Sequence, residues 1–154
     1  MLRDEINTAL KGAMKARDEG RVSTLRLVNA AIKNADIEAE TGKKGALSDD
    51  DLLALLQKLL KQRQEAAEIY DKAGRKELAD KERNEIEIIR GFLPRQMSEA
   101  EAEAAVAEVI KATGATSIKD MGKVMAALKQ SHAGKMDFGK ASGVVKALLS
   151  APGG

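Results

Sequence analysis

Apolar residues recur every three to four positions along the chain, and no segment alternates apolar with polar residues over the length of a strand. Strong helix formers, among them alanine, leucine, glutamate and lysine, dominate the composition. We therefore expect an all-α protein without strands. The spacing predicts a first helix that closes near Asp18 and is broken by Glu19 and Gly20, then a second that fades into the polar residues 40–45.

Capping and stop signals delimit the next two helices. Ser48, with Asp51 three residues later, has the capping-box pattern that opens a long leucine-rich helix. Gly74 supplies its stop. A fourth helix follows over residues 75–90 and ends at Gly91. Leucines cover more than one stripe of the third helix, so we expect it to be central in its domain, or else shared with a partner.

Pro94 marks a domain boundary, because a proline blocks continuation of the preceding helix. Ser98 and Ser117 each begin a capping pattern beyond it, and a polar loop over residues 131–137 precedes a last helix. These signals predict an N-terminal helical domain of about four helices (residues 1–93), a C-terminal domain of three shorter helices (residues 94–150) and a disordered tail (residues 151–154).

Composition narrows the chemistry. The 154 residues include no cysteine, which excludes disulfides and thiolate metal sites, and one histidine, His132, in a polar loop. The segment from Gly134 to Ala141 fits P-loop spacing, but Ala141 replaces the magnesium-binding hydroxyl and a helix precedes it instead of a strand. We therefore expect no catalytic residue, metal or cofactor. No apolar run is long enough for a membrane span, and without an export signal the expected location is the cytoplasm.

Charge is distributed unevenly along the chain. The overall net charge is only +2, and residues 1–93 carry 18 basic and 18 acidic side chains. Residues 111–150, in contrast, carry seven lysines and two aspartates. Lysine suits diffuse contact with phosphates better than the reading of base edges. With only three aromatic residues for stacking, shape and phosphate recognition of a structured RNA is the open nucleic-acid option, and an ordinary solvated surface is its alternative.

Several segments, in the right order and at the right spacing over nearly the whole chain, resemble the GatB/YqeY family. The main ones are Leu59-Leu60-Lys61-Gln62-Arg63-Gln64-Glu65-Ala66, Phe92-Leu93-Pro94-Arg95-Gln96-Met97-Ser98, Thr113-Gly114-Ala115 and Lys119-Asp120-Met121-Gly122-Lys123-Val124-Met125. The resemblance implies an elongated N-terminal helical domain followed by a small C-terminal three-helix bundle. It also implies similarity to the C-terminal tail of the tRNA-dependent amidotransferase B subunit, a tail that contacts tRNA while other domains catalyse amide transfer.

Charge and resemblance together predict a non-catalytic tRNA-binding accessory module in translation, with an aminoacyl-tRNA synthetase or an amidotransferase subunit as a further partner. An amidotransferase-like label, that of a carbon–nitrogen ligase with glutamine as amido donor, would rest on analogy alone. The alternatives are a protein-interaction adaptor that docks through the leucine-rich helices and an amidotransferase activity of the chain itself. The residues expected to contact RNA are Lys119, Gly122, Lys123, Lys135 and Lys140 in the second domain, and Lys15, Arg21 and Arg26 in the first.

Overall fold

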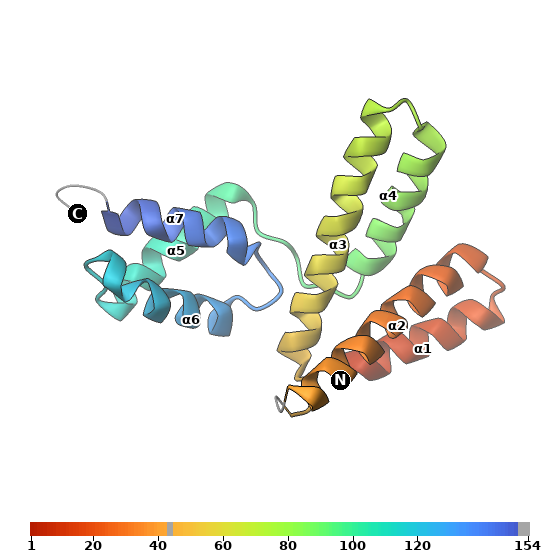
Figure 1. Ribbon diagram of the computed structural model, residues 1–154, viewed down its shortest axis with the longest axis horizontal. Coiled ribbons are helices and arrows are strands. Elements are labelled where there is room, and N and C mark those ends of the chain that lie inside the picture. Colours follow the sequence, from red (N-terminus) through yellow and green to blue (C-terminus); the bar gives the residue numbers. More distant parts are fainter. Residues whose placement is uncertain (43–44, 151–154) are drawn as a thin grey trace. The chain divides into compact units, whose positions relative to one another are not determined.

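The computed structural model describes residues 1–42 and 45–150, so the expected disordered tail lies outside the described residues. The described part contains seven α-helices, one 3-10 turn and no strand, which confirms the all-α prediction (Figure 1). The elements are α1 (Leu2–Lys15), α2 (Glu19–Thr41), α3 (Asp49–Lys72), α4 (Lys76–Arg90), α5 (Glu99–Thr113), the 3-10 turn η1 (Ile118–Asp120), α6 (Met121–Ser131) and α7 (Phe138–Ser150). The chain divides into two compact units, Met1–Pro94 and Arg95–Gly154.

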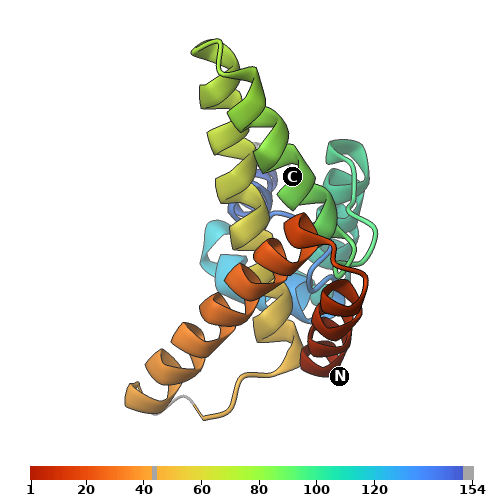
Figure 2. The same cartoon turned by 90° about the vertical axis from the view of Figure 1, so that its right-hand side faces the viewer.

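The first unit consists of two helical hairpins, α1–α2 and α3–α4, which cross one another (Figures 1 and 2). Their crossing is filled by fully buried side chains, among them Ile6, Leu25 and Ile89. Helix α3 contributes Leu52, Leu56 and Leu60 from one face, and further leucines of α3 pack on the same core from its flanks. This confirms that the leucine-rich helix is central in its unit.

Several helix ends follow the predicted signals. Ser48 and Asp51 form a reciprocal capping box at the start of α3, and Ser98 does the same with Glu101 at the start of α5. Gly74 after α3 and Gly114 after α5 adopt left-handed φ angles of 70° and 69°. Glycine reaches this conformation without the clash that a Cβ would cause, so both residues end their helices, Gly74 as the sequence predicts.

The predicted break between the first two helices is wrong. Glu19 and Gly20 lie in the first turn of α2, and α1 already ends at Lys15. The chain turns instead at Arg17, whose φ is 55°, and Asp18 caps α2 by accepting the Arg21 N–H at 3.2 Å. A satisfied helix N-cap therefore decides the boundary, and it outweighs the low helix propensity of the neighbouring glycine.

The second unit is built from α5, α6 and α7, each of which contacts the other two. Val106, Val124, Leu128 and Val145 meet in its centre and are fully buried. Met136, from the turn between α6 and α7, closes one end of this core with only 3% of its surface exposed. The small core fixes the positions of η1 and of the α6–α7 turn, which carry or adjoin the expected RNA-contacting residues of this unit.

Candidate nucleic-acid interface

The corner formed by η1 and the first turn of α6 carries Lys119 and Lys123. Asp120 organises this corner, because its carboxylate accepts the backbone N–H groups of Thr116 at 2.9 Å and Ser117 at 3.3 Å. These two hydrogen bonds lower the pKa of Asp120, and the nearby charge of Lys123 lowers it further. The carboxylate is thus held charged on the backbone, and both lysine side chains remain exposed.

Three backbone amides beside this corner are already hydrogen-bonded within the chain. Asp120 occupies the amides of Thr116 and Ser117, and the Met121 N–H donates to the Ile118 carbonyl because a 3-10 turn runs into α6. At this corner, a phosphate group would therefore bind to lysine side chains rather than to backbone N–H donors.

Gly122 lies in the first turn of α6 and faces open space. A Cβ built on this residue would meet no atom within 4 Å, apart from the backbone of its own helix and its chain neighbours. Close packing of two helices therefore does not explain a glycine at this position. Because Gly122 has no side chain, the backbone of α6 is exposed at this position. In the sequence, Gly122 lies between the exposed residues Lys119 and Lys123.

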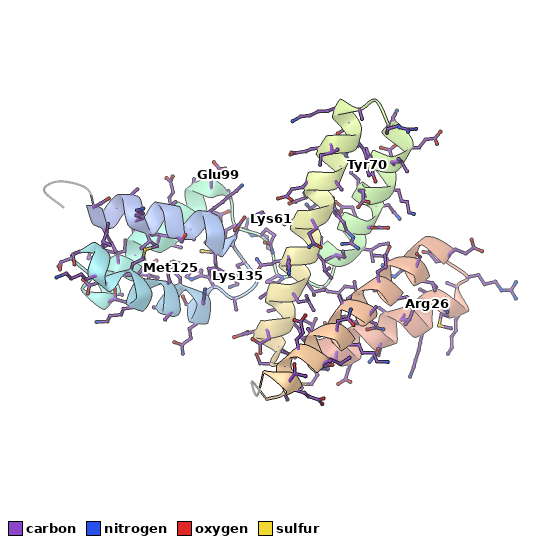
Figure 3. The ribbon with its side chains drawn as sticks, viewed as in Figure 1. Arg26, Lys61, Tyr70, Glu99, Met125 and Lys135 are labelled. Atoms are coloured by element: carbon purple, nitrogen blue, oxygen red, sulfur yellow. The ribbon has the colours of Figure 1, made fainter. Side chains whose placement is uncertain are left out.

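The turn between α6 and α7 holds Lys135. Gly134 is buried with a left-handed φ of 74°, and its carbonyl accepts the Gln96 Nε2 at 2.7 Å. The carbonyl of Lys135 accepts the Met97 N–H at 2.9 Å. Two hydrogen bonds from the segment before α5 thus fix the backbone of this turn, and the Lys135 side chain is exposed on it (Figure 3).

Lys140 lies in the first turn of α7. The carboxylate of Asp137 caps this helix by accepting the N–H groups of Gly139 at 2.9 Å and Lys140 at 3.3 Å. The same bonds explain why the P-loop spacing has no structural counterpart: a helix precedes the turn, and an aspartate occupies amides that a phosphate would need. His132 hydrogen-bonds its neighbour Ser131, with 2.7 Å between Nδ1 and Oγ.

The expected residues of the second unit fall into two groups. Lys119, Gly122 and Lys123 belong to the start of α6, whereas Lys135 follows its end and Lys140 opens α7. Helix α6 has 11 residues and is therefore about 16 Å long, which separates the two groups. The structure thus provides two lysine pairs at opposite ends of one helix, not a single pocket.

The expected residues of the first unit gather at the α1–α2 turn. Lys15 is the last residue of α1, and Arg21 lies in the first turn of α2. Arg26 lies about one turn further along α2 (Figure 3). It lines a hollow of about 490 Å³. Arg17 lines the same hollow and was missed by the sequence reasoning, since only its backbone conformation distinguishes it from other exposed arginines.

The acidic run at the start of α3 has structural roles. Asp49 accepts the Leu2 N–H with both carboxylate oxygens at 3.4 Å, and Asp51 completes the capping box with Ser48. Within residues 1–42 and 45–150, no group of three histidine or acidic side chains could hold a metal ion. Over the same residues, no helix is both long and apolar enough to cross a membrane.

Comparison with known proteins gives the family. A family model described as Yqey-like protein matches residues 3–149. "Altered inheritance of mitochondria protein 41, mitochondrial" of Lachancea thermotolerans is 39% identical over 103 residues, which cover 66% of this chain and 54% of that protein. The protein of the same name from Kluyveromyces lactis is 33% identical over 145 residues, 92% of this chain and 72% of the relative. This chain thus spans about half the length of the Lachancea relative and nearly three quarters of the Kluyveromyces one.

The names of these relatives also correct the expected localisation. Both fungal proteins are named as mitochondrial, so the cytoplasmic prediction is wrong. A composition without cysteine does not distinguish the cytoplasm from the interior of a mitochondrion. The family model matches residues 3–149, which is almost the whole described fold. This match shows that the chain belongs to the YqeY-like family.

Proposed function

We propose that this chain is a non-catalytic RNA-binding accessory module, and that the lysines of its second unit contact the phosphates of tRNA. The observation that carries the proposal is the state of the charges between residues 111 and 146. All seven lysines of this stretch are exposed, and none forms an ion pair within the described part of the chain. They are Lys111, Lys119, Lys123, Lys129, Lys135, Lys140 and Lys146.

The two acidic residues of the stretch are engaged by the backbone. Asp120 and Asp137 both direct their carboxylates to backbone amides, as described above. Several arginines of the chain are neutralised instead, because Arg3, Arg63 and Arg95 each pair with a carboxylate. The lysines therefore leave a positive surface available for an external anion, and phosphates are the anions that lysine binds as a point charge.

The separation of the two lysine groups favours a folded RNA over a small phosphate ligand. A mononucleotide cannot reach both ends of a helix about 16 Å long, whereas the backbone of a structured RNA can. Base stacking adds little, because Phe92 and Phe138 pack against the two cores and Tyr70 lies on α3 (Figure 3). The chain would therefore recognise the shape of the RNA and the positions of its phosphates.

The choice of tRNA rests on the resemblance of this sequence to the tail of an amidotransferase B subunit, which contacts tRNA. The same resemblance supports an aminoacyl-tRNA synthetase or an amidotransferase subunit as the protein that such a module would accompany. Membership of the YqeY-like family is consistent with this role.

The test is the binding of nucleic-acid-free protein to fluorescently labelled tRNA over a salt series. We expect the affinity to fall steeply with salt, because each phosphate contact releases condensed counterions. The double variants Lys119→Gln/Lys123→Gln and Lys135→Gln/Lys140→Gln should each weaken binding and reduce the salt slope by about two. The control Lys11→Gln/Lys33→Gln removes two exposed lysines of the first unit and should change neither quantity. Unchanged binding by both test variants would refute the assignment.

A further inference from the structure

The hollow at the α1–α2 turn combines an apolar surface with cationic side chains. Val22 and Leu27 of α2 supply the apolar part, and Leu27 keeps 48% of its surface exposed although it is a large aliphatic residue. Arg17 and Arg26 line the same hollow, together with Ser23 and Glu19. The hollow thus offers apolar surface and arginine side chains together, and arginine is enriched where proteins bind one another.

The two arginines have no carboxylate partner within the described residues. Arg3, Arg63, Arg83, Arg90 and Arg95 all form ion pairs with Asp or Glu side chains. Asp18, near the hollow, caps α2 by accepting the Arg21 N–H. Glu19 is the one carboxylate among the residues that line the hollow. The hollow thus carries an excess of positive charge, and an acidic partner complements it.

The backbone at Arg17 gives an independent reason to assign a role to its side chain. Its φ of 55° is the only left-handed value of a non-glycine residue in the described chain, and glycine occupies the other left-handed positions. Glycine would be less strained there, because it has no Cβ. An arginine that the fold maintains in a strained conformation at the edge of a hollow indicates a function for its guanidinium.

We propose that this hollow binds an acidic peptide segment of a partner protein. An aliphatic side chain of the peptide packs on Val22 and Leu27, and flanking carboxylates pair with Arg17 and Arg26. The planar guanidinium group suits carboxylates because it donates two parallel hydrogen bonds. The apolar lining favours such a peptide over RNA, whose phosphate backbone has no aliphatic group to bury. This inference concerns the first unit and does not depend on the RNA contacts proposed for the second.

The probe is a fluorescein-labelled peptide in which two leucines are flanked on both sides by glutamates, and fluorescence anisotropy measures its binding to the full chain. One comparison peptide replaces every glutamate with glutamine, and another replaces both leucines with serine. A labelled single-stranded RNA of similar length tests the other class of ligand. We expect the first peptide to bind at least tenfold more tightly than either comparison peptide.

The variants assign the binding to the hollow. Arg17→Gly and Arg26→Gln should each weaken binding of the acidic peptide at least fivefold. Arg17→Gly should also relieve backbone strain, so a thermal unfolding midpoint at or above that of the parent chain would separate the loss of binding from unfolding. Arg75→Gln is the matched control, because Arg75 is an exposed arginine without an ion pair among the described residues, at the turn of the other hairpin. No peptide binding, equal binding of the glutamine peptide, or arginine variants that weaken RNA binding instead would each overturn the proposal.

Discussion

Arg63 on α3 donates a hydrogen bond from Nε to Oε2 of Glu85 on α4 at 2.9 Å. The two side chains are 15% and 11% exposed, and Arg63 Nη1 also donates to the Leu59 carbonyl at 3.1 Å. Burial raises the pKa of Glu82, one turn before Glu85, and the charge of Glu85 raises it further. The ion pair thus joins the two helices of one hairpin in a setting where a single unpaired charge would be unfavourable.

Removal of one partner should destabilise the first unit. We expect Glu85→Ala to lower the free energy of unfolding by about 1–3 kcal/mol, because Arg63 would remain partly buried without its carboxylate. The double variant Arg63→Met/Glu85→Leu should recover most of this loss, since apolar side chains need no partner there. Urea denaturation measures both values. A double variant that is no more stable than Glu85→Ala would contradict this explanation. It would show that the loss in Glu85→Ala does not come from an unpaired Arg63.

The Arg95–Glu101 pair should give a pH-dependent signal. The pKa of Glu101 is lowered to about 2, first by the Arg95 guanidinium and then by the backbone N–H and side chain of Ser98. A lowered pKa in the folded state means that the stabilisation is complete above the ordinary value of 4.5 and is lost as the pH falls towards 2. Carboxyl-detected NMR should show Arg95→Gln raising the pKa of Glu101. Arg90→Gln, which removes the partner of Glu87 in another helix, should leave it in place.

Gly122→Ala separates stability from binding. Glycine within an exposed helical turn lowers stability by about 0.5–1 kcal/mol relative to alanine, and the space around Gly122 is open. We therefore expect Gly122→Ala to raise the free energy of unfolding by about that amount while weakening tRNA binding, because the new methyl group keeps the RNA from the backbone. Gly143→Ala, at an equally open position of α7, should stabilise to a similar extent without changing affinity. Equal affinities of both variants would limit the role of Gly122 to the helix.

Arg17→Gly should stabilise the folded chain. The left-handed φ of 55° costs a residue with a Cβ roughly 1 kcal/mol that glycine avoids, partly offset by the greater freedom of glycine in the unfolded chain. The expected net gain is about 0.5 kcal/mol in thermal or urea unfolding. Arg17→Ala retains the Cβ and should bring no such gain. A loss of stability in Arg17→Gly would mean that the arginine side chain itself supports the turn.

Structural features that depend only on neighbouring residues could be predicted from the sequence. The capping pairs Ser48–Asp51 and Ser98–Glu101 and the stop at Gly74 depend on neighbouring residues only, and all appear as predicted. The central position of α3 followed from leucines that cover more than one stripe. The α1–α2 boundary could not be predicted in the same way, because it depends on Arg17 adopting a conformation that its residue type disfavours.

The expected RNA contacts show a similar limit. Composition located the lysine-rich stretch, but it did not show that Asp120 and Asp137 would turn their carboxylates to the backbone. It also did not show that the stretch divides into two groups along α6, since that depends on which residues close the helix. The hollow beside Arg17 and Arg26 depends on the geometry of the turn that joins α1 and α2, so no local sequence pattern predicts it.

The hydrogen bonds that Gln96 and Met97 send to Gly134 and Lys135 decide where the second unit can be cut from the chain. A fragment that begins at Ser98 would contain α5, α6 and α7 in full, yet it would lack both donors to the turn between the last two helices. Its melting would begin at that turn, and Lys135 would be the first basic residue to lose its fixed position. A fragment that begins at Arg95, where the compact unit starts, retains both donors and three residues before the cap of its first helix.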